Sequence, residues 1–266
     1  MPTIVPLLRI AFHSAKQRAE LFFLLTIFAG LLSSIVYSPA LPAIFALMES
    51  SQEGAEVAEL SAAITDQVPM LIASQLGLLV IAGFLLPLWS RASNPGSLIP
   101  WDGSANTLMR RGILGFLHQL TAAILTLLSW ALIIMVAALL STAGGAVGSL
   151  AILLAITFAI WTSVFFSAAA NTAIISASTD IKMTFSDAIN KNKPYIRPII
   201  GSLAAIWFLS LALDMLLETL LTRLSDGAPN YVILAFLKGT LGFMVAALHI
   251  NILYNIPGLF RTDRQA

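Results

Sequence analysis

The stretch Gly112–Thr179 decides the fold class of this chain: GILGFLHQLTAAILTLLSWALIIMVAALLSTAGGAVGSLAILLAITFAIWTSVFFSAAANTAIISAST. Its 68 residues include no Asp, Glu, Lys or Arg. One helix that crosses the hydrocarbon core of a bilayer needs about 20 residues, so the stretch is too long for one crossing and long enough for two. Ser141–Ser149 consists of small residues with three glycines, which is typical of a turn. We therefore predict two membrane helices joined by this turn.

The composition of the whole chain points to the same class of protein. Of its 266 residues 58% are hydrophobic and 10% are charged, and the mean hydropathy is +0.91. Soluble domains are about 45–50% apolar and roughly 25% charged, so a soluble enzyme, a nucleic-acid-binding protein and a disordered protein are excluded. The chain has no cysteine, which excludes disulfides and thiolate metal sites. The first apolar run, Leu21–Met48, is longer than the roughly 7–15 residues of a signal-peptide core and is expected to be a retained span.

Six segments are long and apolar enough to be spans. Barrel strands are not expected, because Leu150–Ile160 lacks the alternation of apolar and polar residues that such strands show. Pro39 and Pro42 should kink or end the first span, and Pro87 marks the end of the second. The predicted fold is an all-α, polytopic integral membrane protein in which residues 1–266 form one domain with six transmembrane helices, at Leu21–Phe45, Val68–Trp89, Gly112–Leu140, Leu150–Ile175, Pro198–Leu221 and Tyr231–Ile256.

The distribution of charge predicts the orientation of these spans. Twelve of the 14 Lys and Arg residues lie in the N-terminal segment, the two connections Ser90–Arg111 and Ser176–Arg197, and the C-terminal tail. All four segments fall on one side of the membrane if the six spans are correct. The first loop on the other side has no basic residue but carries five acidic ones, Glu49, Glu53, Glu56, Glu59 and Asp66. Because cytoplasmic loops are rich in Lys and Arg, we expect both termini to be cytoplasmic.

The segments before the odd-numbered spans share a pattern. Leu7–Arg18, Asn106–Arg111 and Phe185–Arg197 each combine apolar residues at helical spacing with two to four basic residues. This pattern is typical of a short helix that lies in the headgroup plane. The simplest architecture is therefore three hairpins, each preceded by a short cytoplasmic interfacial helix. The alternative is that these residues only reflect the ordinary positive charge of cytoplasmic loops.

This layout resembles a known family. Phe185–Ile189 followed by Lys193–Arg197 is similar to the aliphatic, basic and aromatic residues that precede the fifth helix of the YciC-type uncharacterised bacterial inner-membrane proteins. The related six-helix membrane domain associated with some glycerophosphodiester phosphodiesterases has the same layout. The resemblance covers most of the chain in layout and about 30 residues in motif. It implies a helical bundle in a bacterial inner membrane with no assigned reaction and no catalytic residue, and the phosphodiesterase barrel is absent.

Ionisable residues inside spans suggest a functional site, because charge at membrane depth is costly. Asp214 and Glu218 are four residues apart and so lie on one face of the fifth span. Lys238 in the sixth span falls at a similar depth to Asp214, about 10 Å below the outer boundary at 1.5 Å per residue. An antiparallel pair of these spans would let Lys238 meet either carboxylate. The three residues are a transport candidate, or an intramembrane ion pair that fixes the register of two helices.

His118 and His249 form a second candidate, for a ligand such as haem or a quinone. Both fall in the cytoplasmic half of their spans. Two histidines without a nearby carboxylate or thiolate make a poor metal site, so we predict neither a metal site nor a cofactor. The amides of five further residues are more typical of hydrogen bonds between membrane helices: Gln75, Gln119, Asn171, Asn251 and Asn255.

The sequence leaves three functions open. It contains no phosphate-binding Walker loop, no G-x-S-x-G elbow, no H-E-x-x-H and no EF-hand loop. The leading hypothesis is a non-enzymatic multi-pass membrane protein that acts as an envelope or membrane-homeostasis factor or as an accessory subunit of a larger membrane complex. Its expected partners are membrane lipids and other membrane subunits, and no nucleic acid. The alternatives are a small-solute or ion transporter that uses Asp214, Glu218 and Lys238, and an integral membrane enzyme that acts on lipids.

Overall fold

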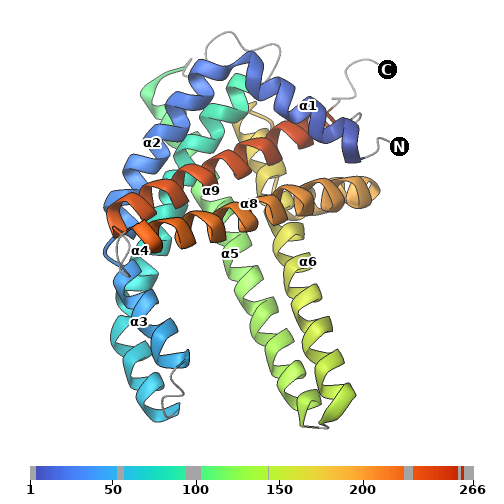
Figure 1. Cartoon of the computed structure of the whole chain (residues 1–266). Helices are drawn as coiled ribbons and strands as arrows, with labels where there is room; N and C mark the ends of the chain where they lie inside the picture. Colours follow the sequence, from blue (N-terminus) through green and yellow to red (C-terminus); the bar gives the residue numbers. More distant parts are fainter. Residues whose placement is uncertain are drawn as a thin grey trace.

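The computed structural model describes residues 4–52, 57–93, 103–142, 144–224, 230–256 and 259–260. These residues form helices and short connections, with no strand among them. Figure 1 shows the helices in chain order: α1 (Ile4–Gln17), α2 (Ala19–Tyr37), α3 (Leu41–Gln52), α4 (Val57–Ser93), α5 (Ala105–Ser141), α6 (Gly145–Ser178), α7 (Phe185–Asn192), the 3₁₀ turn η1 (Lys193–Tyr195), α8 (Ile196–Leu224) and α9 (Tyr231–Tyr254).

Six helical segments within the described residues are long and apolar enough to cross a membrane. They correspond in order to the six spans predicted from the sequence. The chain is thus a multi-pass membrane protein with an all-helical fold. The segments are Ala19–Tyr37, Thr65–Ser93, Ala105–Leu140, Gly148–Ser178, Phe185–Arg223 and Tyr231–Tyr254.

The first span is shorter than predicted. A helix continuing to Phe45 is wrong, because α2 ends at Tyr37 and α3 begins at Leu41. Pro39 has no backbone N–H with which to continue the helical ladder, and the next amide, Ala40, bonds to the Tyr37 carbonyl in a tight turn. The first membrane segment is therefore Ala19–Tyr37, and the residues after it belong to a separate helix.

The second span is longer than predicted. α4 runs from Val57 to Ser93 and contains Pro87 in its interior, so the prediction that Pro87 marks the end of the span is wrong. A proline inside a helix needs space for its ring and leaves one carbonyl without its helical partner. Space exists on the α5 side, where Gly115 is so close that a Cβ added to it would lie 3.0 Å from Pro87 Cγ.

The three predicted interfacial segments fold differently from one another. α1 is a separate helix that ends before Arg18, and α7 is a separate helix whose capping box joins Thr184 to Asp187. Asn106–Arg111, however, is continuous with α5, which Ser104 caps by accepting a hydrogen bond from the Thr107 N–H. The prediction of a separate helix at Asn106–Arg111 is thus wrong, because the helix continues through Gly112 and Gly115, both of which pack closely against α4.

α5 and α6 form one pair of helices and α8 and α9 another, and α4 packs against both pairs (Figure 1). α5 and α6 lie side by side along their length and extend away from the other helices. α2 packs against α9 and α4, and α8 packs along α9, so that α8 and α9 cross the direction of α5 and α6. The turn between α5 and α6 is tighter than predicted, because Gly144 and Gly145 adopt positive φ angles of 68° and 54°, which glycine tolerates without strain.

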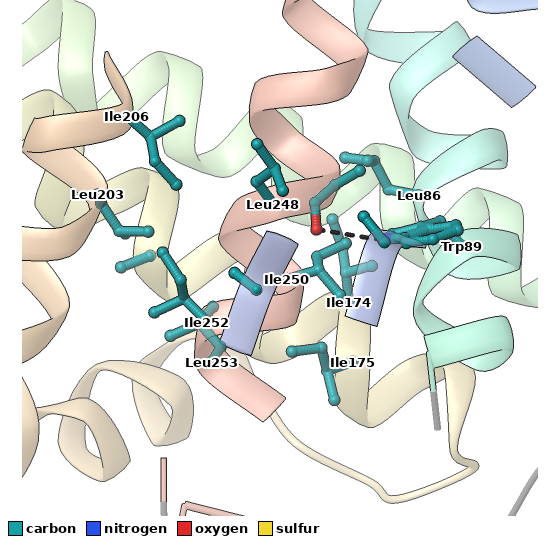
Figure 2. Packing of buried hydrophobic residues seen from close by; sticks show 14 of the residues in the cluster. Leu86, Trp89, Ile174, Ile175, Leu203, Ile206, Leu248, Ile250, Ile252 and Leu253 are labelled. Carbon is teal, nitrogen blue, oxygen red and sulfur yellow. Dashed lines mark hydrogen bonds between the residues drawn. The ribbon is translucent and has the colours of Figure 1, made fainter. Parts of the chain in front are cut away.

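The main core lies where the ends of α4, α6, α8 and α9 meet, with α1 across them (Figures 1 and 2). Figure 2 shows Leu86 and Trp89 of α4 facing Ile174 of α6 and Leu248 of α9. Trp89 is fully buried, and the ring of Phe22 from α2 lies against it with centroids 5.1 Å apart. Burial is therefore concentrated at one end of the molecule.

Asn251 of α9 connects three helices inside this core. Its Nδ2 donates to the Ala11 carbonyl of α1 at 3.0 Å. Its Oδ1 accepts from Trp89 Nε1 at 3.1 Å and from Ser93 Oγ at 2.9 Å, both on α4. The side chain is fully buried, so this amide satisfies polar groups that have no access to water. The sequence correctly predicts a helix–helix hydrogen bond for Asn251.

Two glycines of α9 allow a matched test of the close packing between α2 and α9. A Cβ at Gly239 would collide with the Ser33 side chain and lie 3.3 Å from the Ala29 carbonyl oxygen, whereas a Cβ at Gly242 would meet nothing within 4 Å. We expect Gly239→Ala to lower the free energy of unfolding by about 1–3 kcal/mol through overpacking. Gly242→Ala should leave it unchanged or raise it. Thermal unfolding in detergent measures both effects. Equal melting temperatures for the two variants would contradict the close contact of Gly239 with α2.

Candidate functional site: a charged cavity between α2, α4, α8 and α9

The structure brings Asp214, Glu218 and Lys238 together. Asp214 and Glu218 lie one turn apart on α8, and Lys238 reaches them from the second turn of α9. Lys238 Nζ lies 2.9 Å from Asp214 Oδ2 and 3.2 Å from Glu218 Oε2. The three side chains, which we call the charge triad, are 21–30% exposed. With every member ionised, the charge triad carries a net charge of −1.

A cavity of about 480 Å³ lies beside the charge triad. Asp214 and Lys238 line it, while most of its wall is apolar. The uncharged polar side chains that line it come from three helices: Ser33 and Tyr37 of α2, Gln75 of α4 and Ser210 of α8. Tyr37 also lies within electrostatic range of all three members of the charge triad. The arrangement is a pocket with a hydrophobic wall and a few convergent polar groups, as small-molecule sites usually are.

Sequence reasoning missed three of these polar residues. Ser33 and Tyr37 are four residues apart, as are Ser210 and Asp214, so each pair occupies one helical face. That spacing was the available signal, but it does not say which face of α2 turns toward α8. Gln75 was expected to make a hydrogen bond between helices, and instead it lines the cavity.

A buried oxygen of the charge triad has no hydrogen-bond partner among the described residues. Asp214 Oδ2 accepts from Lys238, whereas Asp214 Oδ1 is buried and accepts from no donor among the described residues. An ionised carboxylate has about four lone-pair sites to satisfy. Asp214 Oδ1 is covered by protein atoms, so the cavity meets Asp214 at the part of its side chain that is exposed.

The two histidines do not form a common site in the described residues. His118 is half-buried on α5, which packs chiefly on α6 and α4, whereas α9 packs chiefly on α2 and α8. His249 is buried in the core, and its Nε2 has no hydrogen-bond partner among the described residues. No hydrogen bond between the two rings occurs there, and the same residues contain no group of three or more potential metal ligands. His249 is best described as a residue of the core.

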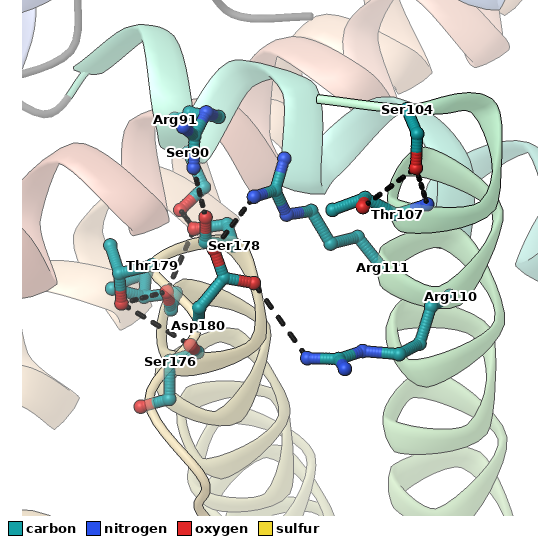
Figure 3. Close-up of polar contacts among 11 residues, drawn as sticks. Ser90, Arg91, Ser104, Thr107, Arg110, Arg111, Ser176, Ser178, Thr179 and Asp180 are labelled. Atoms are coloured by element: carbon teal, nitrogen blue, oxygen red, sulfur yellow. Dashed lines mark hydrogen bonds and ion pairs between the residues drawn. The ribbon is translucent and has the colours of Figure 1, made fainter. Parts of the chain in front are cut away.

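A second polar cluster lies where α4, α5 and α6 meet (Figure 3). Arg111 Nη2 at the start of α5 lies 2.7 Å from Asp180 Oδ2 just after α6, and Arg110 lies 3.7 Å from Asp180 Oδ1. Arg91 Nη1 of α4 donates to the Ser178 carbonyl at 2.9 Å. Arg111 and Asp180 are the charges that immediately flank the uncharged stretch Gly112–Thr179. The ion pair therefore holds the two ends of that stretch together.

The Arg111–Asp180 pair can be tested without disturbing the backbone. Asp180 has a positive φ of 59°, which asparagine tolerates well. Asp180→Asn should lower the free energy of unfolding by about 1.5 kcal/mol, the usual worth of a hydrogen bond to a charged group. Asp66→Asn removes the same charge from an exposed position of α4 and should change it little. If the two variants are equally stable in thermal unfolding, the Arg111–Asp180 pair contributes nothing to the free energy of unfolding.

Comparisons with protein-family models, with curated proteins and with solved structures found no match to this chain.

Proposed function

We propose that this chain is a non-enzymatic protein of a bacterial cytoplasmic membrane that acts as a membrane-homeostasis factor or as an accessory subunit of a larger complex. In this proposal it crosses the membrane six times as three hairpins, with both termini in the cytoplasm. The pattern of basic residues supports this orientation. The Arg111–Asp180 pair supports the hairpin of α5 and α6, because it joins the first turns of α5 to the residues after α6, opposite the turn that connects the two helices. The same proposal includes that this chain shares the layout of the YciC-type proteins.

The observation that carries the accessory role is the exposure of α5 and α6. None of the residues in the most apolar part of α5 is buried, and 11% are buried in that of α6, against 39% in α2. Large hydrophobic side chains are exposed along both helices from Ile124 to Trp161. Apolar surface of this kind contacts lipid or the membrane helices of another subunit.

Photo-crosslinking from matched positions tests the accessory role. Leu139 on α5 is 67% exposed and Ile35 on α2 is 72% exposed. A photo-reactive amino acid at Leu139 should crosslink one defined membrane protein in its native membrane, in a fixed ratio to this chain. The same group at Ile35 should give lipid adducts only. Lipid adducts alone at both positions would contradict an accessory subunit.

The second candidate function is a small-solute or ion transporter, and the cavity beside the charge triad favours it. A pocket that holds charged groups at membrane depth is the arrangement expected of a transport site. In reconstituted vesicles, the protein should then dissipate an imposed pH or sodium gradient faster than empty vesicles do. Neutralising both carboxylates, with Asp214→Asn and Glu218→Gln, should abolish this flux. Flux that survives the double substitution would exclude a transport route through the charge triad.

A further inference from the structure

The size and walls of the cavity indicate an organic occupant. Its volume of about 480 Å³ falls in the range of about 300–1,000 Å³ that small-molecule pockets have. Leu79 of α4, Trp207 of α8 and Phe243 of α9 are among the apolar residues that line it. A bare metal ion needs several oxygen ligands around it, and the polar groups here are too widely distributed among apolar residues to supply a shell.

The charges around the cavity indicate the sign of the occupant. α8 contributes Asp214 and Glu218, α9 contributes Lys238, and α2 contributes the uncharged phenol of Tyr37. α4 contributes Gln75 and apolar residues to the same wall. One ammonium thus faces two carboxylates. Because net charge at membrane depth is unfavourable, a further positive charge beside Asp214 stabilises the site, and an anion is repelled.

We propose that the cavity binds a protonated amine with a small apolar body. Its ammonium group lies beside the Asp214 carboxylate and supplies the positive charge that the charge triad lacks. Its apolar part lies against Leu79, Trp207 and Phe243. The ammonium group belongs either to a free amine or to the headgroup of an aminolipid, since both offer the same chemistry.

This proposal deepens the transporter alternative by naming the class of ligand, and it concerns binding alone. A protein that binds an amine without moving it satisfies the proposal and fails the flux test. A protein that dissipates an ion gradient without binding amines passes the flux test and contradicts the proposal. The two outcomes are therefore distinguishable.

Calorimetric titration of benzylamine tests the proposal. The protein is placed in phosphatidylcholine nanodiscs, and heats from empty nanodiscs are subtracted. Benzyl alcohol has nearly the same shape without the charge. Benzylamine should bind saturably and at least tenfold more tightly than benzyl alcohol. Equal affinities, or no saturable binding of benzylamine, would overturn the proposal.

Four substitutions locate the amine. Asp214→Asn should weaken benzylamine binding at least tenfold, whereas Glu20→Gln, which removes the same charge from the first turn of α2, should not. Lys238→Met should strengthen it at least tenfold, because the amine then replaces the missing ammonium group. A purely structural ion pair predicts no such gain. Gly242→Leu places a side chain in the open space of the cavity and should weaken binding. Unchanged affinity in both Asp214→Asn and Gly242→Leu would contradict this location even if Lys238→Met fails to fold.

The lipid composition of the nanodisc identifies the source of the amine. If the natural occupant is an aminolipid, adding phosphatidylethanolamine should weaken benzylamine binding by competition. If it is a free amine, the affinity should stay the same. Both results can be obtained only if benzylamine binds in phosphatidylcholine nanodiscs. If that binding is absent, the proposal is wrong whatever the effect of phosphatidylethanolamine.

Discussion

Replacing Lys238 by methionine is expected to destabilise the protein by about 2–3 kcal/mol, less than the loss of one partner from a fully buried ion pair, because the charge triad is partly exposed. Lys238 is within 3.2 Å of both carboxylates of the charge triad. Without it, Asp214 and Glu218 remain one turn apart on α8, and no other described residue forms an ion pair with them. One carboxylate then has to take up a proton, or α8 has to move away from α9. Either response costs folding free energy, which unfolding in mixed micelles measures.

Two further variants separate charge from packing. Lys182→Met removes a basic residue from an exposed position and should have almost no effect. The triple variant Lys238→Met, Asp214→Asn and Glu218→Gln has no uncompensated charge and should recover most of the stability that the single variant loses. If the triple variant is as unstable as Lys238→Met alone, the loss comes from packing and the ion pairs do not carry it.

Replacing Asn251 by leucine is expected to destabilise the protein by about 2–4 kcal/mol, because the buried Ala11 carbonyl and the half-buried Ser93 hydroxyl lose a partner, and a buried polar group without a partner costs about 1–3 kcal/mol. Leucine has a similar volume but can neither donate nor accept hydrogen bonds. The Ala11 carbonyl and the Ser93 hydroxyl each lose a buried partner, while Trp89 Nε1 keeps its bond to the Ala247 carbonyl. The loss should appear as a lower melting temperature and as easier proteolysis after α1.

Gln119→Leu is the matched control for Asn251. Gln119 is a half-buried amide on α5 whose bond to Asn171 is 3.4 Å long, near the limit for a hydrogen bond. Its replacement should cost less than about 1 kcal/mol, the average net worth of a hydrogen bond. If both variants lose the same stability, the connection of α1, α4 and α9 through Asn251 is not what stabilises the core.

The sequence predicts the membrane segments well because their length and apolar character are local properties. The six predicted apolar runs correspond to the six helical segments that are long and apolar enough to cross a membrane. The spacing of Asp214 and Glu218 places both on one face of α8. The contact with Lys238 follows from the similar depth of these residues in adjacent helices. Each of these inferences depends only on helical geometry and on the cost of charge in lipid.

Other features depend on three-dimensional packing and could not be predicted. Pro87 lies inside α4 because α5 presents a glycine to its ring, and no local pattern reports that neighbour. Asn106–Arg111 and Leu7–Arg18 have similar compositions, yet the first continues α5 and the second ends before α2. The cavity is formed by faces of four helices, so Ser33, Tyr37 and Ser210 acquire a role only once those faces meet.

The pair of Arg111 and Asp180 links the sequence to the fold most directly. The two residues enclose the longest uncharged stretch of the chain, and they lie in contact at 2.7 Å. The stretch starts after Arg111, runs along α5 and returns along α6 to Asp180, so both of its ends lie at the same end of the hairpin. In a membrane, this return requires that the residues before α5 and after α6 face the same compartment.

Labelling of single cysteines from outside intact cells tests the six-span topology most directly. The chain contains no cysteine of its own, so each introduced thiol reports one position. A membrane-impermeant maleimide should label Thr142→Cys and Asp66→Cys in intact cells. It should label Asn106→Cys and Ser186→Cys only after the membrane is opened. Labelling of Asn106→Cys and Thr142→Cys from the same side would contradict a six-span protein with cytoplasmic termini.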